Sequence, residues 1–205
     1  MALSEHGIEA TPDVEDRPDV RYGEQAPGRH DGEDREAAPK QLTESAAARY
    51  VWAVTRLALG WVFAWAFLDK LFGLGHETPA GKGWIDGASP TEGFLTNAPK
   101  GPFAGFYHGL AGAAWADWLF MIGLAGIGAA LLLGIGVRIA AASGALMLVL
   151  MWTAVLPPDN NPFMDDHLIY AIVLAGLALV KAGDTLGLGR RWSRTALVRR
   201  FPVLR

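Results

Sequence analysis

Two long stretches without a charged side chain follow one another in the second half of the chain. Residues 118–137 contain 20 positions without an acid or a base, residues 139–156 contain 18 more, and only Arg138 separates them. A helix of about 20 apolar residues can cross the roughly 30 Å hydrocarbon core of a bilayer and pairs its own backbone groups there. The chain is therefore expected to be a multi-span membrane protein, which agrees with its 51% content of hydrophobic residues.

Two further apolar stretches complete the expected bundle. Residues 50–68 are apolar apart from Thr55 and Arg56, and residues 168–180 form a shorter run. As a helix the shorter run measures about 20 Å, which is less than the thickness of the core, so we expect residues 165–167 to enter the interfacial zone. The predicted fold class is all-α, a bundle of four transmembrane helices.

The long connection between the first two spans, residues 73–115, contains signals for short helices. Ser89-Pro90-Thr91-Glu92 is typical of a capping box with a proline in the first turn, and it predicts a helix through Phe94 and Leu95. A second short helix is expected to begin at Pro102. We expect both helices to lie on the extracytoplasmic side of the membrane.

Charge divides the chain into three expected domains. Residues 1–45 hold 12 acids and 5 bases, whereas the remainder holds 9 acids and 13 bases. Residues 1–44 have few large apolar side chains and are predicted to be a disordered acidic tail, either merely solvated or binding a partner. Residues 45–184 are the membrane domain, and residues 185–205 form a basic tail that can bind anionic membrane lipids.

Basic residues beside short loops predict the orientation of the spans. With four spans, Arg49, Arg138, Lys181 and the arginines of 190–205 fall on one side, which should be cytoplasmic. We therefore expect an inner-membrane, multi-pass protein with both termini in the cytoplasm. On the outer side, we expect an aromatic belt of Trp65, Trp115, Trp118 and Trp152.

Several classes of chemistry are disfavoured. The chain has no cysteine, so it cannot hold a covalent haem or a cysteine-ligated iron–sulfur cluster, and any thiol for sulfur transfer belongs to a partner. A non-covalent haem needs two histidines within spans, and none lies there. We expect no nucleic-acid partner because no such motif is present. A metal site at Asp165, Asp166 and His167 is not expected either, because neighbouring helical residues point in different directions.

The same three residues are nevertheless the leading candidates for catalysis. Ionisable groups at the entrance to a span are costly unless they are paired or wet, which makes them functional candidates. Alternatively, the two carboxylates only complement the positive end of a helix dipole. Imidazole exchanges protons near neutral pH, as quinone reduction requires. We predict His167, Asp166 and Asp165 as catalytic residues and a quinone as co-substrate.

The outer ends of the four spans are expected to bring further polar residues to this site. Lys70 would attract an anionic substrate or headgroup. Arg56, inside span one, either snorkels to the headgroups or is buried in a pair with an acid or an anionic ligand. The predicted substrate-binding or quinone-binding residues are Asp69, Lys70, Trp84, Asp86, His108 and Arg56.

Several segments together resemble the DoxX/DoxD family of bacterial and archaeal membrane proteins. They are residues 67–70 (FLDK), 84–87 (WIDG), 89–95 (SPTEGFL) and 161–167 (NPFMDDH). The resemblance, over residues 50–182, implies the membrane subunit of a thiosulfate:quinone oxidoreductase, or a scaffold for soluble superoxide dismutase and sulfurtransferase partners in redox homeostasis. Whether the chain is an enzyme, a scaffold or a small lipid-binding or transport protein stays open at this point, as does its oligomeric state.

Overall fold

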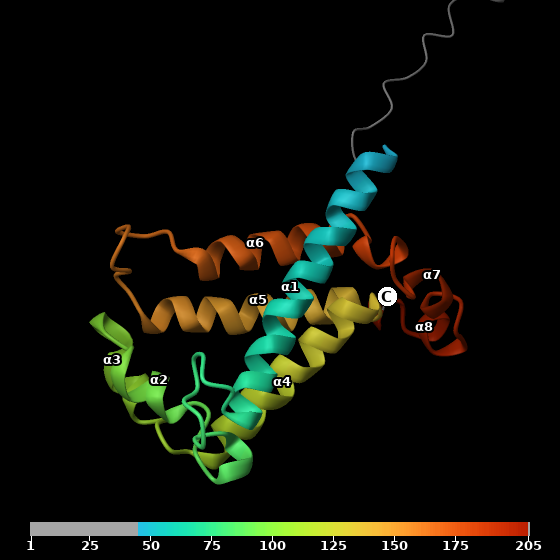
Figure 1. Ribbon diagram of the computed structural model, residues 1–205. Coiled ribbons are helices and arrows are strands. Elements are labelled where there is room, and N and C mark those ends of the chain that lie inside the picture. The colour runs from blue at the N-terminus through green and yellow to red at the C-terminus, as the bar shows by residue number, and fades with distance from the viewer. Residues whose placement is uncertain (1–44, 205) are drawn as a thin grey trace, which may run out of the picture. The chain divides into compact units, whose positions relative to one another are not determined.

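The computed structural model describes residues 45–204, which form helices without any strand in that range (Figure 1). The predictions for the acidic tail, residues 1–44, lie outside the described residues. The helical fold class is confirmed.

Four helices make up most of the described fold. They are α1 (Ala46–Phe72), α4 (Ala114–Leu133), α5 (Val137–Ala154) and α6 (Asp166–Leu179). The shorter elements are η2 (Trp84–Asp86), α2 (Glu92–Asn97), η3 (Gly101–Phe103), α3 (Ala104–His108), η4 (Ala182–Asp184), α7 (Gly189–Trp192), α8 (Ala196–Arg200) and η5 (Pro202–Leu204).

Three of the described helices, α1, α4 and α5, are long and apolar enough to cross a membrane. Large apolar side chains such as Val62, Ile122 and Leu146 stay exposed on them, as expected for surfaces in contact with lipid. Helix α6 has 14 residues, about 21 Å at the rise of an α-helix. The fourth span therefore stays a prediction, as does the extracytoplasmic position of the short helices.

The helices pack as two pairs, α1 with α4 and α5 with α6, and the pairs meet mainly through α4 and α5. In Figure 1 the first pair crosses the second obliquely instead of running parallel to it. Leu131, Leu174 and Leu177 are buried completely between them. Small residues permit the close approach: a Cβ atom at Gly128 would lie 2.8 Å from the backbone nitrogen of Ala64.

The connection between α1 and α4 is anchored on the end of α5. The hydroxyl of Tyr107 donates to the carbonyl oxygen of Leu150 at 2.9 Å. The backbone N–H of Lys100 donates to the carbonyl oxygen of Ala154 at 3.0 Å. Before α2, Ser89 Oγ accepts from the backbone N–H of Glu92 at 3.1 Å. The bonds of Tyr107 and Lys100 hold the short helices against the bundle, and that of Ser89 fixes the start of α2.

Residues 185–204 also fold against the bundle. The backbone N–H of Leu188 donates to the carbonyl oxygen of Leu133 at 2.8 Å, and the indole N–H of Trp192 donates to Leu204 at 2.6 Å. The segment predicted as a basic tail thus contains α7 and α8, and its contacts with the helices continue beyond Asp184.

Candidate functional site

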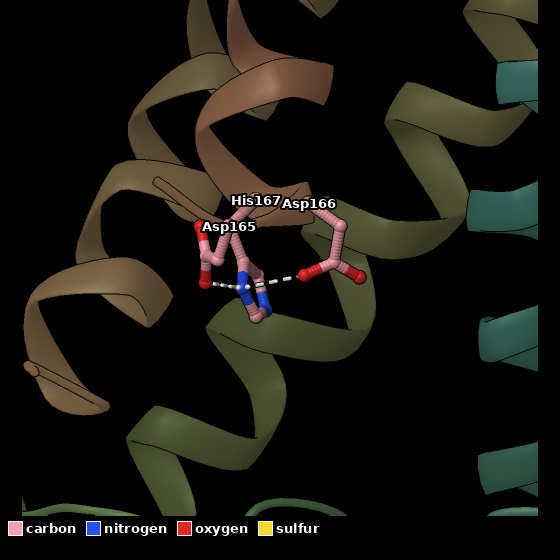
Figure 2. A group of neighbouring side chains, drawn as sticks. All are labelled: Asp165, Asp166 and His167. Carbon is pink, nitrogen blue, oxygen red and sulfur yellow. Dashed lines mark hydrogen bonds and ion pairs between the residues drawn. The ribbon is translucent and has the colours of Figure 1, made fainter. Parts of the chain in front are cut away.

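Asp165, Asp166 and His167 form a connected cluster at the start of α6 (Figure 2). Asp165 is the N-cap: its Oδ1 accepts from the backbone N–H of Leu168 at 3.2 Å. Its Oδ2 lies 2.7 Å from His167 Nδ1, and Asp166 Oδ1 lies 3.5 Å from the same nitrogen. The helix-start interpretation is therefore confirmed for Asp165, and the same carboxylate contacts the imidazole.

The loop before the cluster is fixed to α5. Asn161 Oδ1 accepts from the backbone N–H groups of Phe163 and Met164, each at 3.0 Å, and closes a tight turn. The indole N–H of Trp152 donates to the carbonyl oxygen of Phe163 at 2.8 Å, and the two rings meet edge to face at 5.2 Å. The end of α5 thereby positions the residues that lead into α6.

The geometry of the cluster suits proton exchange. The side chains of Asp165 and His167 are 13% and 21% exposed, whereas that of Asp166 is 71% exposed. A carboxylate at hydrogen-bond distance from Nδ1 favours the tautomer with its proton there, which leaves Nε2 with a lone pair. Among residues 45–204 no side chain or backbone group bonds to Nε2. His167 can therefore accept a proton while Asp165 stabilises the resulting charge.

The three side chains also have the composition of a weak metal site. One ligand atom from each lies within 4.8 Å of the others. The separation of 2.7 Å between Nδ1 and Asp165 Oδ2, however, is that of a hydrogen bond.

The other predicted carboxylates each hold a loop. Asp69, which is 1% exposed, accepts from the backbone N–H groups of Thr78 at 2.8 Å and His76 at 3.4 Å. Asp86 Oδ2 accepts from the backbone N–H of Gly83 at 3.1 Å. Both residues therefore stabilise the segment that follows α1.

The remaining outer residues are spread over several elements. Lys70 is half-buried near the end of α1, and His108 is exposed at the end of α3. The indole of Trp84 meets that of Trp118 edge to face at 4.6 Å. None of the hydrogen bonds, ion pairs or ring contacts described for these three residues reaches the cluster at the start of α6.

Sequence reasoning did not assign partners to Asp117, which is buried at the start of α4. One carboxylate oxygen accepts from Ser89 Oγ at 2.8 Å, from Thr91 Oγ1 at 2.6 Å and from the backbone N–H of Thr91 at 3.2 Å. A second missed interaction is the ion pair of Lys100 with Asp159. The first interaction ties the 73–113 connection to the start of α4 and the second ties it to the loop between α5 and α6. No local sequence signal identifies such distant partners.

Arg56 is buried completely, at 0% exposure, in the half of α1 that lies away from Asp69. Its guanidinium donates to backbone carbonyl oxygens only: those of Leu131, Leu132 (3.1 Å), Ala182 (3.2 Å), Thr185 (3.4 Å) and Leu186 (2.8 Å). The snorkelling interpretation of Arg56 is therefore wrong, and its described partners include no acid. The side chain satisfies orphan carbonyls at the end of α4 and in the turns after α6.

The structure thus separates the predicted site residues into several groups. Figure 1 shows the start of α6 well apart from the end of α1, which carries Asp69 and Lys70. The bonds described for Asp165 and His167 stay within the cluster and the first turn of α6. None of the hydrogen bonds described for Asp69, Asp86 and Arg56 reaches His167.

Comparison with protein families matches residues 51–157 to the DoxX family. The chain belongs to the DoxX family. The matched segment runs from α1 to just beyond α5, so the resemblance seen in the sequence is confirmed for more than half of the chain. It ends before Asp165, and the cluster and α6 lie outside it. No curated protein and no solved structure matches the chain.

Proposed function

We propose that this DoxX-family protein is the membrane subunit of a quinone-linked oxidoreductase, in which the Asp165-Asp166-His167 cluster exchanges protons with the quinone. The observation that carries the proposal is the half-buried imidazole held by Asp165, with Nε2 available, at the start of an apolar helix. Quinone reduction consumes protons, and a histidine beside carboxylates supplies them near neutral pH.

The proposed reaction takes two electrons from a sulfur donor. In the thiosulfate case implied by the family resemblance, two thiosulfate ions, one quinone and two protons give one tetrathionate and one quinol. Each thiosulfate loses one electron as the new S–S bond forms, and the quinone gains both electrons. Because the chain has no cysteine, the sulfur chemistry cannot pass through a thiol of this subunit and requires only binding here or in a partner.

The roles of the cluster residues follow from their exposure. His167 gives the proton from Nε2 to a reduced quinone oxygen, and Asp165 holds the imidazole through Nδ1. Asp166 is the most exposed of the three and lies 3.5 Å from Nδ1, so its charge stabilises the imidazolium while water supplies the proton that Nε2 takes up. Asp165 has a second duty as N-cap, so its replacement would disturb the helix as well as the imidazole.

The test compares His167→Ala and Asp166→Asn with the wild type in membranes that receive thiosulfate and a quinone. We expect quinone reduction to fall about 10²-fold or more in His167→Ala, the range of a lost proton-transfer residue, and less in Asp166→Asn. Asp159→Asn is the matched control, because Asp159 is an exposed acid of the same loop outside the cluster. Unchanged turnover in His167→Ala at normal protein level would remove the catalytic assignment.

A second candidate function is a non-catalytic membrane scaffold for soluble redox or sulfurtransferase enzymes. The specific observation in its favour is that five arginines, Arg190, Arg191, Arg194, Arg199 and Arg200, are exposed on and around the short helices α7 and α8. If this surface binds a partner, Arg190→Gln with Arg200→Gln will release a co-expressed superoxide dismutase or sulfurtransferase from the purified complex. An enzyme without a scaffold role would keep its quinone reduction in the same variant and show no such partner.

A further inference from the structure

A groove with a volume of about 360 Å³ lies between α4 and α5, on a surface remote from the cluster at the start of α6. Ile122 and Gly126 of α4 and Ile139 and Ser143 of α5 are among its lining residues, and Trp192 and Leu204 of the C-terminal segment also line it. Its volume falls within the range of about 300–1,000 Å³ that is typical of small-molecule sites.

The lining of the groove is hydrocarbon in character. Its two side-chain donors are occupied within the chain: Ser143 Oγ donates to the carbonyl oxygen of Ile139 at 2.8 Å, and Trp192 Nε1 donates to Leu204 at 2.6 Å. Ile122 and Ile139 are exposed at 63% and 44%, so the groove opens toward the surface that faces lipid. An alkyl chain fits such a lining better than a polar molecule, because it leaves no hydrogen-bonding group unpaired.

The arginines beside Trp192 favour an anionic lipid over a second copy of the chain as the occupant of the groove. Residues 185–204 contain five arginines and no acid, and Arg190, Arg191 and Arg194 are exposed within two residues of Trp192. Such clusters beside a membrane attract anionic headgroups. A second copy, related by a two-fold axis through the groove, would instead bring two sets of arginines together, and like charges oppose association.

We propose that this groove binds an acyl chain of an anionic phospholipid, and that the arginines of residues 190–194 hold its phosphate headgroup. The proposal is independent of the quinone chemistry, because no residue of the cluster lines the groove. It assigns the C-terminal segment a defined role: Trp192 lines the site for the chain, and the neighbouring arginines provide its charge.

The experiment uses the purified full chain in detergent and adds phosphatidylglycerol or phosphatidylcholine with identical acyl chains. Native mass spectrometry counts the retained lipid, and thermal unfolding gives the shift in Tm relative to each variant without lipid. We expect the wild type to retain phosphatidylglycerol preferentially and to gain Tm. Replacing Arg190, Arg191 and Arg194 together by glutamine should weaken phosphatidylglycerol binding about a hundredfold while phosphatidylcholine binding is unchanged.

Gly126→Leu fills the groove, and a Cβ atom there meets no atom within 4 Å, so the fold tolerates the change. We expect it to abolish the Tm shift with phosphatidylglycerol, whereas Ala175→Leu on an exposed position of α6 keeps it. Ser143→Leu, on the opposite wall, provides the same test if Gly126→Leu unfolds. Equal binding of both lipids by the wild type, a full shift in the filled variants, or a dimer that the filling disrupts would each overturn the proposal.

Discussion

Arg56 uses all three guanidinium nitrogens to bind carbonyl oxygens from segments that are 75 to 130 residues away in the chain. Arg56→Met keeps much of the apolar volume but removes every donor, so the carbonyls of Leu131 and Ala182 lose their side-chain partner in an apolar setting. We expect a loss of about 1–3 kcal/mol in the free energy of unfolding for each carbonyl that stays buried and unpaired, and a lower Tm in detergent.

Arg138→Gln is the matched control for that change, because Arg138 is exposed at the start of α5. We expect it to alter Tm little, as surface substitutions do. Arg56→Lys should fall between the two variants, since an ammonium group cannot reach carbonyls in three segments at once. If Arg56→Met unfolds at the wild-type temperature, the carbonyl contacts do not stabilise the fold.

The buried carboxylate of Asp117 holds the 73–113 connection, because one of its oxygens accepts from both Ser89 and Thr91. Asp117→Ala should leave two hydroxyl groups and a backbone N–H without this acceptor, at a cost of about 1–3 kcal/mol for each group that stays buried and unpaired. We expect faster proteolysis within residues 73–113 by an added protease. Glu92→Gln, at an exposed position nearby, should be cleaved at the wild-type rate.

At this scale, the sequence predicts contacts between close neighbours better than contacts between distant ones. Asp165 and His167 meet with only Asp166 between them at a helix start. The expectation that neighbouring helical residues point in different directions missed that all three side chains come within 4.8 Å of one another. The partners of Arg56 are main-chain atoms, which carry no residue-specific signal. Residue types alone thus favoured snorkelling or an acidic partner for this side chain.

Two glycines on the same helix, α4, test how closely the helices pack. A Cβ atom at Gly128 would lie 2.8 Å from the backbone of Ala64, whereas one at Gly126 would meet nothing within 4 Å. We expect Gly128→Ala to lower the free energy of unfolding by about 1–3 kcal/mol through overpacking. Gly126→Ala should raise it by up to about 1 kcal/mol, because alanine favours the helix. Equal Tm values for both variants would contradict the close α1–α4 contact.

Whether α6 crosses the membrane can be tested directly, because its 14 residues are fewer than the roughly 20 that span a typical bilayer. The chain has no cysteine, so single cysteines report their side of the membrane without background. If α6 spans, Asn160→Cys will react with an impermeant maleimide in intact spheroplasts, and Ala196→Cys only after permeabilisation. Labelling of both from the same side would remove the fourth span and the predicted orientation.

The apolar runs predicted the long helices well, because a segment in lipid has to pair its own backbone groups. The relative positions of their ends were less predictable. Four parallel rods would gather Asp69, Asp86 and His167 at one end of a bundle, but the oblique crossing of the α1–α4 and α5–α6 pairs separates the ends (Figure 1). Crossing angles depend on packing, here on contacts such as that of Gly144 in α5 with Ile127 in α4, and not on the hydrophobic pattern.

This arrangement of the whole molecule can be tested with cysteine pairs and a short bis-maleimide linker. Lys100 and Asp159 form an ion pair, so cysteines at these two positions should be joined readily. Cysteines at Asp86 and Asp166 should not be joined, because η2 packs against α1, whose end lies apart from the start of α6 (Figure 1). Both pairs use exposed or half-buried positions, which makes their reactivity comparable. Efficient linkage of Asp86→Cys to Asp166→Cys would show that the polar ends converge in the membrane, and it would restore a single site in which Asp86 and His167 act on one substrate.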